Sequence, residues 1–351
     1  MRLISGLLAL ALVLGGCSSL GSSGHAEHSA QLGLVEPDPL GRMLYGNKHT
    51  MHASMLADLK TQAVFQGYTD EQIMRVMSLM GSDYTWPVSA PEVRGKAGVL
   101  VLAHGFGDHG DAVLRARLAG EAESRPVTLA LGMSMMTSDH IQLGLNELAE
   151  SGARDIVILP VVSTHTNSLM RQWEYIFDLS DEAEYARVPR VESNARLHFA
   201  SPPDDHPLIG QILLDYAQEI SAVPRNEEVI IVGHGPVDPA DNREQLRLME
   251  NLAAMLRDGS EFAAVHVVSL QDDAPRDVRM ARIRELRELV GQANMRGREV
   301  LVVTNLLGTR VVQSSLRRAL RGLNYRFNPR GMIEHDNFSM WVDESVSAAL
   351  R

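Results

Sequence analysis

Four uninterrupted hydrophobic runs, each bounded by glycine, charged or polar residues, recur along the chain. They lie within residues 98–103, 155–162, 228–233 and 299–304, where Asp155, Glu228 and Glu299 mark the start of the last three. Runs of this length without polar alternation are typical of strands that are buried on both faces of a parallel sheet. Between the first two runs, Ile141, Leu145 and Leu148 recur at helical spacing. The pattern therefore predicts strand–helix–strand units and an α/β fold.

Further helices are predicted on either side of the first two runs. Residues 51–82 form an expected helical hairpin, in which Thr69 to Gln72 fit a capping box before hydrophobic residues on one helix face. The segment Tyr84 to Pro91 contains two prolines and is expected to end this hairpin. Residues 167–177 form the predicted helix that follows the second run.

The order of elements repeats after about 130 residues, which indicates an internal duplication. Residues 228–235 repeat the pattern of residues 99–105, including the His-Gly pair that ends it. In this alignment His104 matches His234, and His165 matches Arg310. We therefore expect an N-terminal helical segment over 51–90, followed by two related halves over 91–225 and 226–351.

The N-terminus has the pattern of a secretory signal. A positively charged start precedes about a dozen apolar residues, a length below the roughly 20 residues that a membrane-spanning helix needs. The sequence Leu14-Gly-Gly-Cys17 resembles the bacterial lipobox, in which the cysteine is lipidated and becomes the mature N-terminus. We expect a signal peptide over 1–17, lipidation of Cys17 and a polar tether over 18–50. Ser18 favours sorting to the outer membrane, with the body facing the periplasm.

Composition limits what the exported body can do. Cys17 is the only cysteine, so the body has no thiol for a disulfide, a thiolate ligand or a cysteine nucleophile. With 351 residues and 45% hydrophobic composition, the chain can build one large or two medium hydrophobic cores. The net charge of −11 argues against nucleic acid or an anionic membrane as a partner.

Two histidines follow the carboxyl ends of predicted strands. His104 directly follows the first hydrophobic run, and His165 comes five residues after Pro160. Ligands of open α/β sheets bind at the carboxyl ends of strands, and histidine is a common ligand of divalent metals. These two residues are the candidate catalytic and metal-binding residues, and His234 is a third metal candidate. The alternative is that each imidazole only satisfies a loop carbonyl.

Two longer motifs resemble the sirohydrochlorin cobalt- and ferrochelatase family. Ala103-His-Gly-Phe-Gly-Asp108 is similar to the family's strand-GHGSR-D opening, and Gly152 to Val162 resembles the stretch G-A-R-R-I-V-V-V-P-L-F. Residues 196–208 are similar to the segment that follows in the family. The resemblance covers residues 97–346.

The resemblance implies two chelatase-like halves, with parallel sheets flanked by helices and facing each other across a cleft. It also implies that two histidines and a glutamate hold Co²⁺ or Fe²⁺ and accept pyrrole protons while the metal enters a tetrapyrrole. His104 fits the first histidine. The second would fall at Ser168, three residues beyond His165, and the glutamate would fall near Met133 to Met135, where this chain has no carboxylate.

Three functions follow from these observations. The first is insertion of a divalent metal into sirohydrochlorin or a related tetrapyrrole. The second is a non-catalytic metal- or tetrapyrrole-binding lipoprotein, which the missing glutamate favours. The third is an α/β-hydrolase, because a strand followed by His-Gly also resembles the oxyanion loop of that fold. An α/β-hydrolase needs a nucleophile within a Gly-x-Ser-x-Gly motif, and Ser134 lacks the second glycine of that motif.

Overall fold

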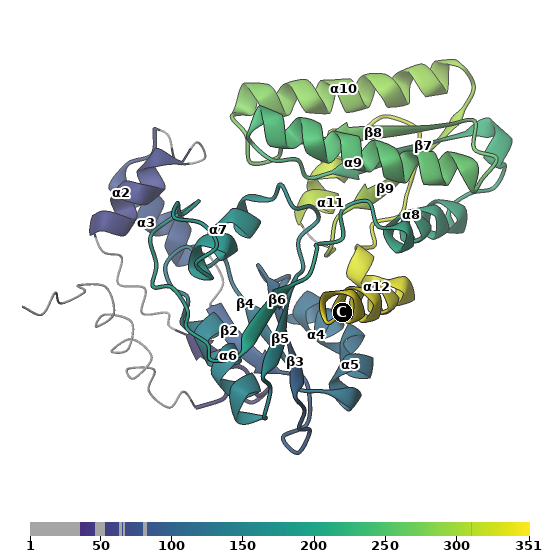
Figure 1. Cartoon of the computed structure of the whole chain (residues 1–351). Helices are drawn as coiled ribbons and strands as arrows, with labels where there is room; N and C mark the ends of the chain where they lie inside the picture. Colours follow the sequence, from purple (N-terminus) through teal and green to yellow (C-terminus); the bar gives the residue numbers. More distant parts are fainter. Residues whose placement is uncertain (1–35, 46–52, 63–64, 66, 80–82, 310) are drawn as a thin grey trace, which may run out of the picture.

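The protein contains two parallel-rich sheets, each flanked by helices on both faces (Figure 1). The computed structural model describes residues 36–45, 53–62, 65, 67–79, 83–309 and 311–351. The expected signal peptide and Cys17 therefore lie outside the described residues. The α/β fold predicted from the hydrophobic runs is confirmed, since each run forms the central part of a sheet.

The first sheet has six strands, in the order β1-β2-β4-β3-β5-β6. Strands β4, β3, β5 and β6 are parallel, whereas β2 pairs antiparallel with β4 and β1 pairs antiparallel with β2. In that order, the strands are β1 (Met43–Tyr45), β2 (Asp83–Pro87), β4 (Val127–Leu131), β3 (Ala97–Ala103), β5 (Asp155–Pro160) and β6 (Arg196–Phe199).

The second sheet has four strands that are all parallel, in the order β10-β9-β7-β8. They are β10 (Arg326–Phe327), β9 (Glu299–Asn305), β7 (Glu227–Gly233) and β8 (Ala264–Ser269). In both sheets the central strand, β3 or β7, carries the His-Gly pair at its carboxyl end. The expected duplication is therefore visible in the strand order around β3 and β7.

Helices cover both faces of each sheet. One hydrophobic cluster lies on the outer face of the first sheet and a second on the outer face of the second sheet. A third and larger cluster joins the inner faces of both sheets. The outer helices are α6 (Asp139–Glu150), α7 (Ser168–Ile176), α10 (Arg276–Met295) and α11 (Val311–Ala319). The inner helices are α4 (Gly107–Arg117), α5 (Ala119–Ser124), α8 (Pro207–Glu219), α9 (Pro239–Asp258) and α12 (Asp336–Ala349).

The expected boundary between residues 225 and 226 separates the two halves along the sequence, but helices on either side of it pack against the opposite half. Helix α8 precedes this boundary, yet it packs against α9 and β9 of the second half. Helix α12 ends the chain, yet it contacts α8, α4 and β5. Trp341 and Phe338 of α12 are almost fully buried in the cluster that both sheets share. The halves therefore exchange helices and fold around a common core.

The N-terminal segment departs from the expected tether and helical hairpin. Helices α2 (Ala53–Thr61) and α3 (Asp70–Leu79) are present, and the capping box is confirmed by reciprocal hydrogen bonds between Thr69 and Gln72. However, residues 43–45 of the expected tether form β1, and residues 83–87 form β2 rather than a helix terminator. The indole of Trp86 on β2 donates to the carbonyl of Leu40, which fixes the segment before β1 on the sheet.

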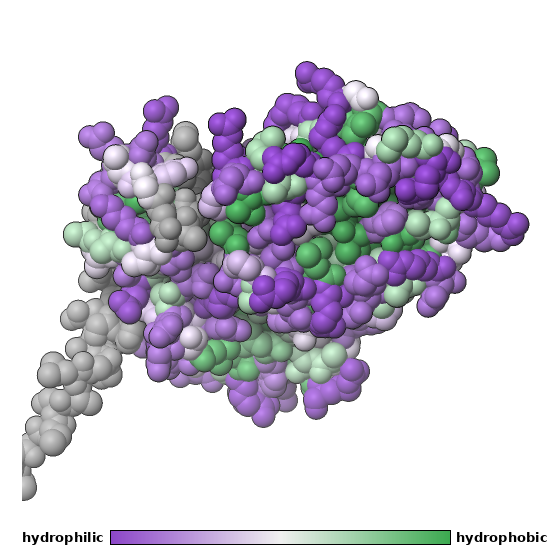
Figure 2. Space-filling view, turned by 90° about the horizontal axis from the view of Figure 1, so that it is seen from above, coloured by the Kyte–Doolittle hydropathy of each residue, from purple (hydrophilic) through white to green (hydrophobic). Residues whose placement is uncertain are grey.

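The surface carries hydrophobic residues in small groups among hydrophilic ones, as the face in Figure 2 illustrates. No helix in the described ranges is both long enough and hydrophobic enough to cross a membrane.

Candidate functional site

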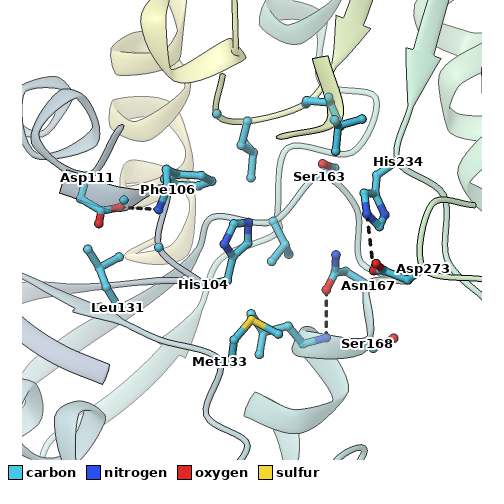
Figure 3. Close-up of a pocket in the computed structure, with 18 of the residues that line it drawn as sticks. His104, Phe106, Asp111, Leu131, Met133, Ser163, Asn167, Ser168, His234 and Asp273 are labelled. Carbon is cyan, nitrogen blue, oxygen red and sulfur yellow. Dashed lines mark hydrogen bonds and ion pairs between the residues drawn. The ribbon is translucent and has the colours of Figure 1, made fainter. Parts of the chain in front are cut away.

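A cavity of about 790 Å³ lies between the carboxyl edges of the two sheets (Figure 3). Each central strand contributes its histidine, His104 after β3 and His234 after β7. The volume is within the range of pockets that hold small-molecule ligands. Its wall is mixed, with hydrophobic side chains such as Leu131 and Leu307 beside polar ones such as Asn167 and Gln313.

His104 projects from the end of β3 into this cavity, where its ring and that of Phe106 pack edge to face with centroids 4.7 Å apart. Gly105 follows with a φ of 89°, a conformation that suits glycine and turns the chain sharply after the histidine. The residue is exposed to the cavity, which lies between the two halves. Desolvation lowers the pKa of His104, an effect that nearby Asp111 opposes and His234 reinforces. The shift favours the neutral imidazole.

Asp111 on α4 holds the loop that carries His104. This carboxylate is 3% exposed, and it accepts hydrogen bonds from the backbone N–H of Phe106 and the hydroxyl of Tyr84, the latter at 2.6 Å. Tyr84 comes from β2, so the additional antiparallel strand supports the site. Neither residue stood out in the sequence, because a buried carboxylate on a helix has no motif of its own. Asp111 and Tyr84 are positioning residues.

The second half contributes a histidine and a carboxylate to the same cavity. The Nε2 atom of His234 lies 3.4 Å from Oδ2 of Asp273, which follows β8. The Asp273 side chain is 64% exposed, so it is available to a ligand. Asp273 was not among the residues expected from the sequence. Imidazole nitrogen and carboxylate oxygen are both common donors to divalent transition metals.

The pairing registers explain why Asp273 stands where it does. Ala103 pairs with Leu131 in the first sheet, and Gly233 pairs with Ser269 in the second. Since His104 and His234 follow Ala103 and Gly233, the loop over 133–135 corresponds to the loop over 271–273. The carboxylate missing at residues 133–135 is therefore present at the equivalent place of the second half.

The first half has Met133 in this part of the cavity, below His104 (Figure 3). Met135 is 5% exposed and packs with Leu59, Ile73 and Met77 of the N-terminal helices. The loop over residues 133–135, here called the methionine loop, therefore serves mainly as packing for α2 and α3, as expected. Of its residues, Met133 alone reaches the cavity.

His165 does not join His104 and His234, which corrects the pairing expected from the sequence. It does not line the cavity, and its Nδ1 lies 3.1 Å from both carboxylate oxygens of Asp204. The backbone N–H of His165 also donates to Asp204, at 2.8 Å. Its Nε2 faces Glu244 of α9 at 3.9 Å. The imidazole is held by Asp204 of its own half and faces Glu244 of the other half, and the cavity wall nearby is formed instead by Ser168.

The registers also correct one match within the duplication. Leu102 pairs with Pro160, and Val232 pairs with Thr304, so His165 corresponds to Thr309 rather than to Arg310. Ser168, the place of the family's second histidine, corresponds to Val312. Both Ser168 and Val312 line the cavity. Neither side chain is a usual metal ligand, and Arg310 lies outside the described residues.

The charged groups of the cavity wall are mostly acidic. Among described lining residues, Asp108, Asp111 and Asp273 stand beside one arginine, Arg42. Arg42 precedes β1 and pairs with Asp38 at 2.8 Å and with Asp108 at 2.7 Å. The Asp108 side chain is 84% exposed, which leaves it open to a cation. This wall favours a cationic ligand over an anionic one.

Ser134 does not support the hydrolase interpretation. It has a φ of 53°, and its Oγ lies 3.3 Å from Nε2 of His140, as a nucleophile and base would. However, Ser134 is 0% exposed, and its hydroxyl also accepts from the indole of Trp173. Burial lowers the pKa of His140 to about 3, so this imidazole does not gain a proton at neutral pH. The arrangement is a buried structural contact.

In the described part of the chain, no three histidine, cysteine or acidic side chains gather closely enough to hold a metal ion. His234 and Asp273 are adjacent, and His104 faces the same cavity from the other half. A metal ion could therefore be held by three donors only if the two sides of the cavity approach each other.

A buried carboxylate beside the methionine loop predicts a dependence of stability on pH. Burial raises the pKa of Asp83 to about 7, against a hydrogen bond from the backbone of Met133, with Asp139 raising it further. The unfolded chain releases this proton near pH 3.9. Between pH 4 and 7 the folded state thus holds more protons, and the free energy of unfolding should fall as the pH rises.

Asp83→Asn keeps the acceptor for Met133 and removes this titration. We expect chemical denaturation to show a smaller fall in stability between pH 4 and 7, by up to about 4 kcal/mol. Glu147, whose pKa burial also raises to about 7, should account for much of the remaining fall. Asp181→Asn, at an exposed carboxylate, is the control. An unchanged slope in Asp83→Asn would mean that Asp83 is ionised at neutral pH.

No protein-family model matches the chain, and no curated protein matches its sequence. Among solved structures, SirB from Bacillus subtilis with Fe³⁺ aligns at a TM-score of 0.52 and 18% identity, over 73% of this chain and 98% of SirB. DR2241 from Deinococcus radiodurans, a multi-domain protein with structural similarity to chelatases and two additional novel domains, aligns at 0.47 and 18% identity. That alignment covers 73% of this chain and 56% of DR2241. The chain has a chelatase-like fold.

Proposed function

We propose that this protein binds a divalent transition-metal ion in the cavity between its two halves, and that it holds the ion rather than inserting it rapidly into a tetrapyrrole. The metal is the cargo, with Co²⁺ and Fe²⁺ as the ions that the family resemblance suggests. The observation that carries the proposal is the pair His234 and Asp273, which faces the same cavity as His104.

The donor set supports this proposal. His234 and Asp273 offer one imidazole and one carboxylate, and His104 offers a second imidazole from the opposite wall. An imidazole must be neutral to bind a metal ion, and desolvation lowers the pKa of His104, which favours the neutral form. Asp273, whose side chain is 64% exposed, adds negative charge that attracts a cation into the cavity, whereas the charge of Asp108 is offset by Arg42.

The same features argue against efficient insertion. The resemblance implies that a carboxylate beside His104 accepts a pyrrole proton, and Met133 stands in this part of the cavity instead. His165, the second expected acceptor, is engaged by Asp204 outside the cavity wall. A tetrapyrrole with several acidic side chains would also meet a mainly acidic wall. Insertion into sirohydrochlorin is therefore the second candidate function, supported by the fold and by the place of His104.

Titration and turnover of the wild-type protein separate the two functions. We expect calorimetry at pH 7.5 to give one site for Co²⁺, and absorbance spectra to give little acceleration of cobalt insertion into sirohydrochlorin. Rapid insertion at catalytic protein concentrations would instead favour the chelatase. Absence of any binding by Co²⁺, Fe²⁺, Ni²⁺ or Zn²⁺ would contradict the metal-binding proposal.

We also propose that the protein is an exported lipoprotein, anchored through Cys17 to the outer membrane on its periplasmic side. The support is the apolar N-terminal run ending in Leu14-Gly-Gly-Cys17. In Cys17→Ser the acceptor thiol for the lipid is absent, so processing should stop or the protein should leave the membrane fraction. Fractionation and mass spectrometry of the N-terminus test this. A wild-type protein that is cytoplasmic and retains Met1 would contradict it.

A further inference from the structure

The charge of the second half is distributed unevenly, despite the net charge of −11 for the whole chain. Residues 300–333 contain six arginines and no aspartate or glutamate. Arg317 and Arg318 lie in the last turn of α11, Arg321 follows two residues after its end, and all three are exposed. Arg287 of α10 reaches the same place, because its guanidinium donates to the carbonyls of Ala319 and Arg321. These four residues form the arginine face.

The arginine face lacks neutralising partners. Among the described residues none of the four guanidinium groups forms an ion pair, whereas 14 of the other described arginines do. Arg318 donates only to the hydroxyl of Ser315, and Arg317 stacks over the ring of Phe327 at 5.3 Å. Stacking and capping hold the side chains in place but leave their charge uncompensated. Such a face fits a partner that carries several negative charges.

We infer that the arginine face binds anionic lipid headgroups of the membrane to which the chain is anchored. This inference rests on the proposed lipoprotein anchor and is independent of the proposed metal site. The lipid on Cys17 would keep a membrane surface close to the body, which raises its effective concentration. Guanidinium groups bind phosphate in a two-pronged manner, and each arginine near an anionic surface contributes to binding. A net negative protein can still dock through a local patch, because charges beyond about 8–10 Å are screened.

A spin label beside the arginine face tests this inference in the full chain. Ser314 is exposed on α11, three to four residues before Arg317 and Arg318, and Ser193 is exposed on the first half. Ser314→Cys and Ser193→Cys would each be introduced into a Cys17→Ser chain, which has no other thiol and no lipid, then labelled and mixed with phosphatidylcholine vesicles, with or without phosphatidylglycerol. We expect phosphatidylglycerol to shield the label at 314, and not at 193, from a water-soluble relaxation agent. High salt should remove the shielding.

Charge variants provide the matched comparison. In R317Q/R318Q/R321Q the affinity for phosphatidylglycerol vesicles should fall by on the order of 10- to 100-fold. R187Q/R196Q/R225Q removes three exposed arginines elsewhere and should leave the affinity unchanged. Shielding that persists in the first variant would overturn the inference, as would arginine-dependent binding of heparin without binding of vesicles. Because the Cys17→Ser chain carries no lipid, the comparison measures the arginine face alone, so failure of the proposed anchor is distinguishable from failure of this inference.

Discussion

Gly235→Ala should destabilise the protein by about 3 kcal/mol or more. Gly235 follows His234 with a φ of 83°, and a Cβ atom there would lie 1.8 Å from the hydroxyl of Ser269. The added methyl would also meet Asn242 and the backbone of Gln271 at 3.0 Å. Overpacking and backbone strain each cost about 1–3 kcal/mol. Chemical denaturation monitored by circular dichroism would measure the loss.

The duplication supplies the control for this variant. Gly105 occupies the equivalent place after His104 with a φ of 89°, but its Cβ would meet only Asp111, at 3.9 Å. Gly105→Ala therefore carries the backbone strain without the clash, and should cost about 1 kcal/mol. Equal losses in the two variants would show that the backbone conformation alone decides the cost, and that the loop after His234 has room for a side chain.

His234→Ala and Asp273→Asn should each weaken Co²⁺ binding on the order of 100-fold. Loss of a residue that only supports a metal ligand weakens binding by about 10- to 100-fold, and loss of a ligand itself should reach the upper end of that range. Each removes one of two adjacent donors, and asparagine keeps the size of the aspartate while losing its charge. His104→Ala should weaken binding by a similar factor, since it removes the donor of the opposite wall. Calorimetry at pH 7.5 measures all three.

His165→Ala is the comparison that separates this assignment from the one based on sequence. His165 is bound to Asp204 and lies outside the cavity wall, so its loss should leave Co²⁺ affinity within about twofold of the wild type. A large loss of Co²⁺ affinity in His165→Ala, combined with little change in His234→Ala, would show that the metal site lies in the first half.

The central strands could be predicted from the sequence because they are buried on both faces. β3, β5, β7 and β9 are continuous hydrophobic runs, and their carboxyl ends placed His104 and His234 correctly at one edge of each sheet. The flanking strands were less visible. β8 is interrupted by His266, which pairs with Glu228 at 3.1 Å, and β2 ends in Trp86-Pro87. Whether such a segment forms a strand depends on hydrogen bonds to neighbouring strands, and these bonds cannot be recognised from the segment's own sequence.

The site was predicted only in part, for two physical reasons. His165 is directed away from the cavity by Asp204, a residue 39 positions later, and no local spacing predicts such a contact. Asp273 could have been found, because it occupies the equivalent place of residues 133–135 in the duplicated half. Finding it requires the strand β8, which the hydrophobic pattern does not reveal because His266 interrupts it. The exchange of α8 and α12 between the halves likewise depends on a shared core that becomes visible only in three dimensions.

The location of bound cobalt tests the central claim most directly. Crystals of the protein soaked with Co²⁺ and measured at the cobalt absorption edge would give the position of the ion by anomalous scattering. Our account predicts one peak in the cavity, about 2.0–2.2 Å from an imidazole nitrogen of His234 and a carboxylate oxygen of Asp273, with His104 as the ligand from the opposite wall. A peak between His165 and Glu244, or no peak in the cavity at saturating Co²⁺, would contradict it.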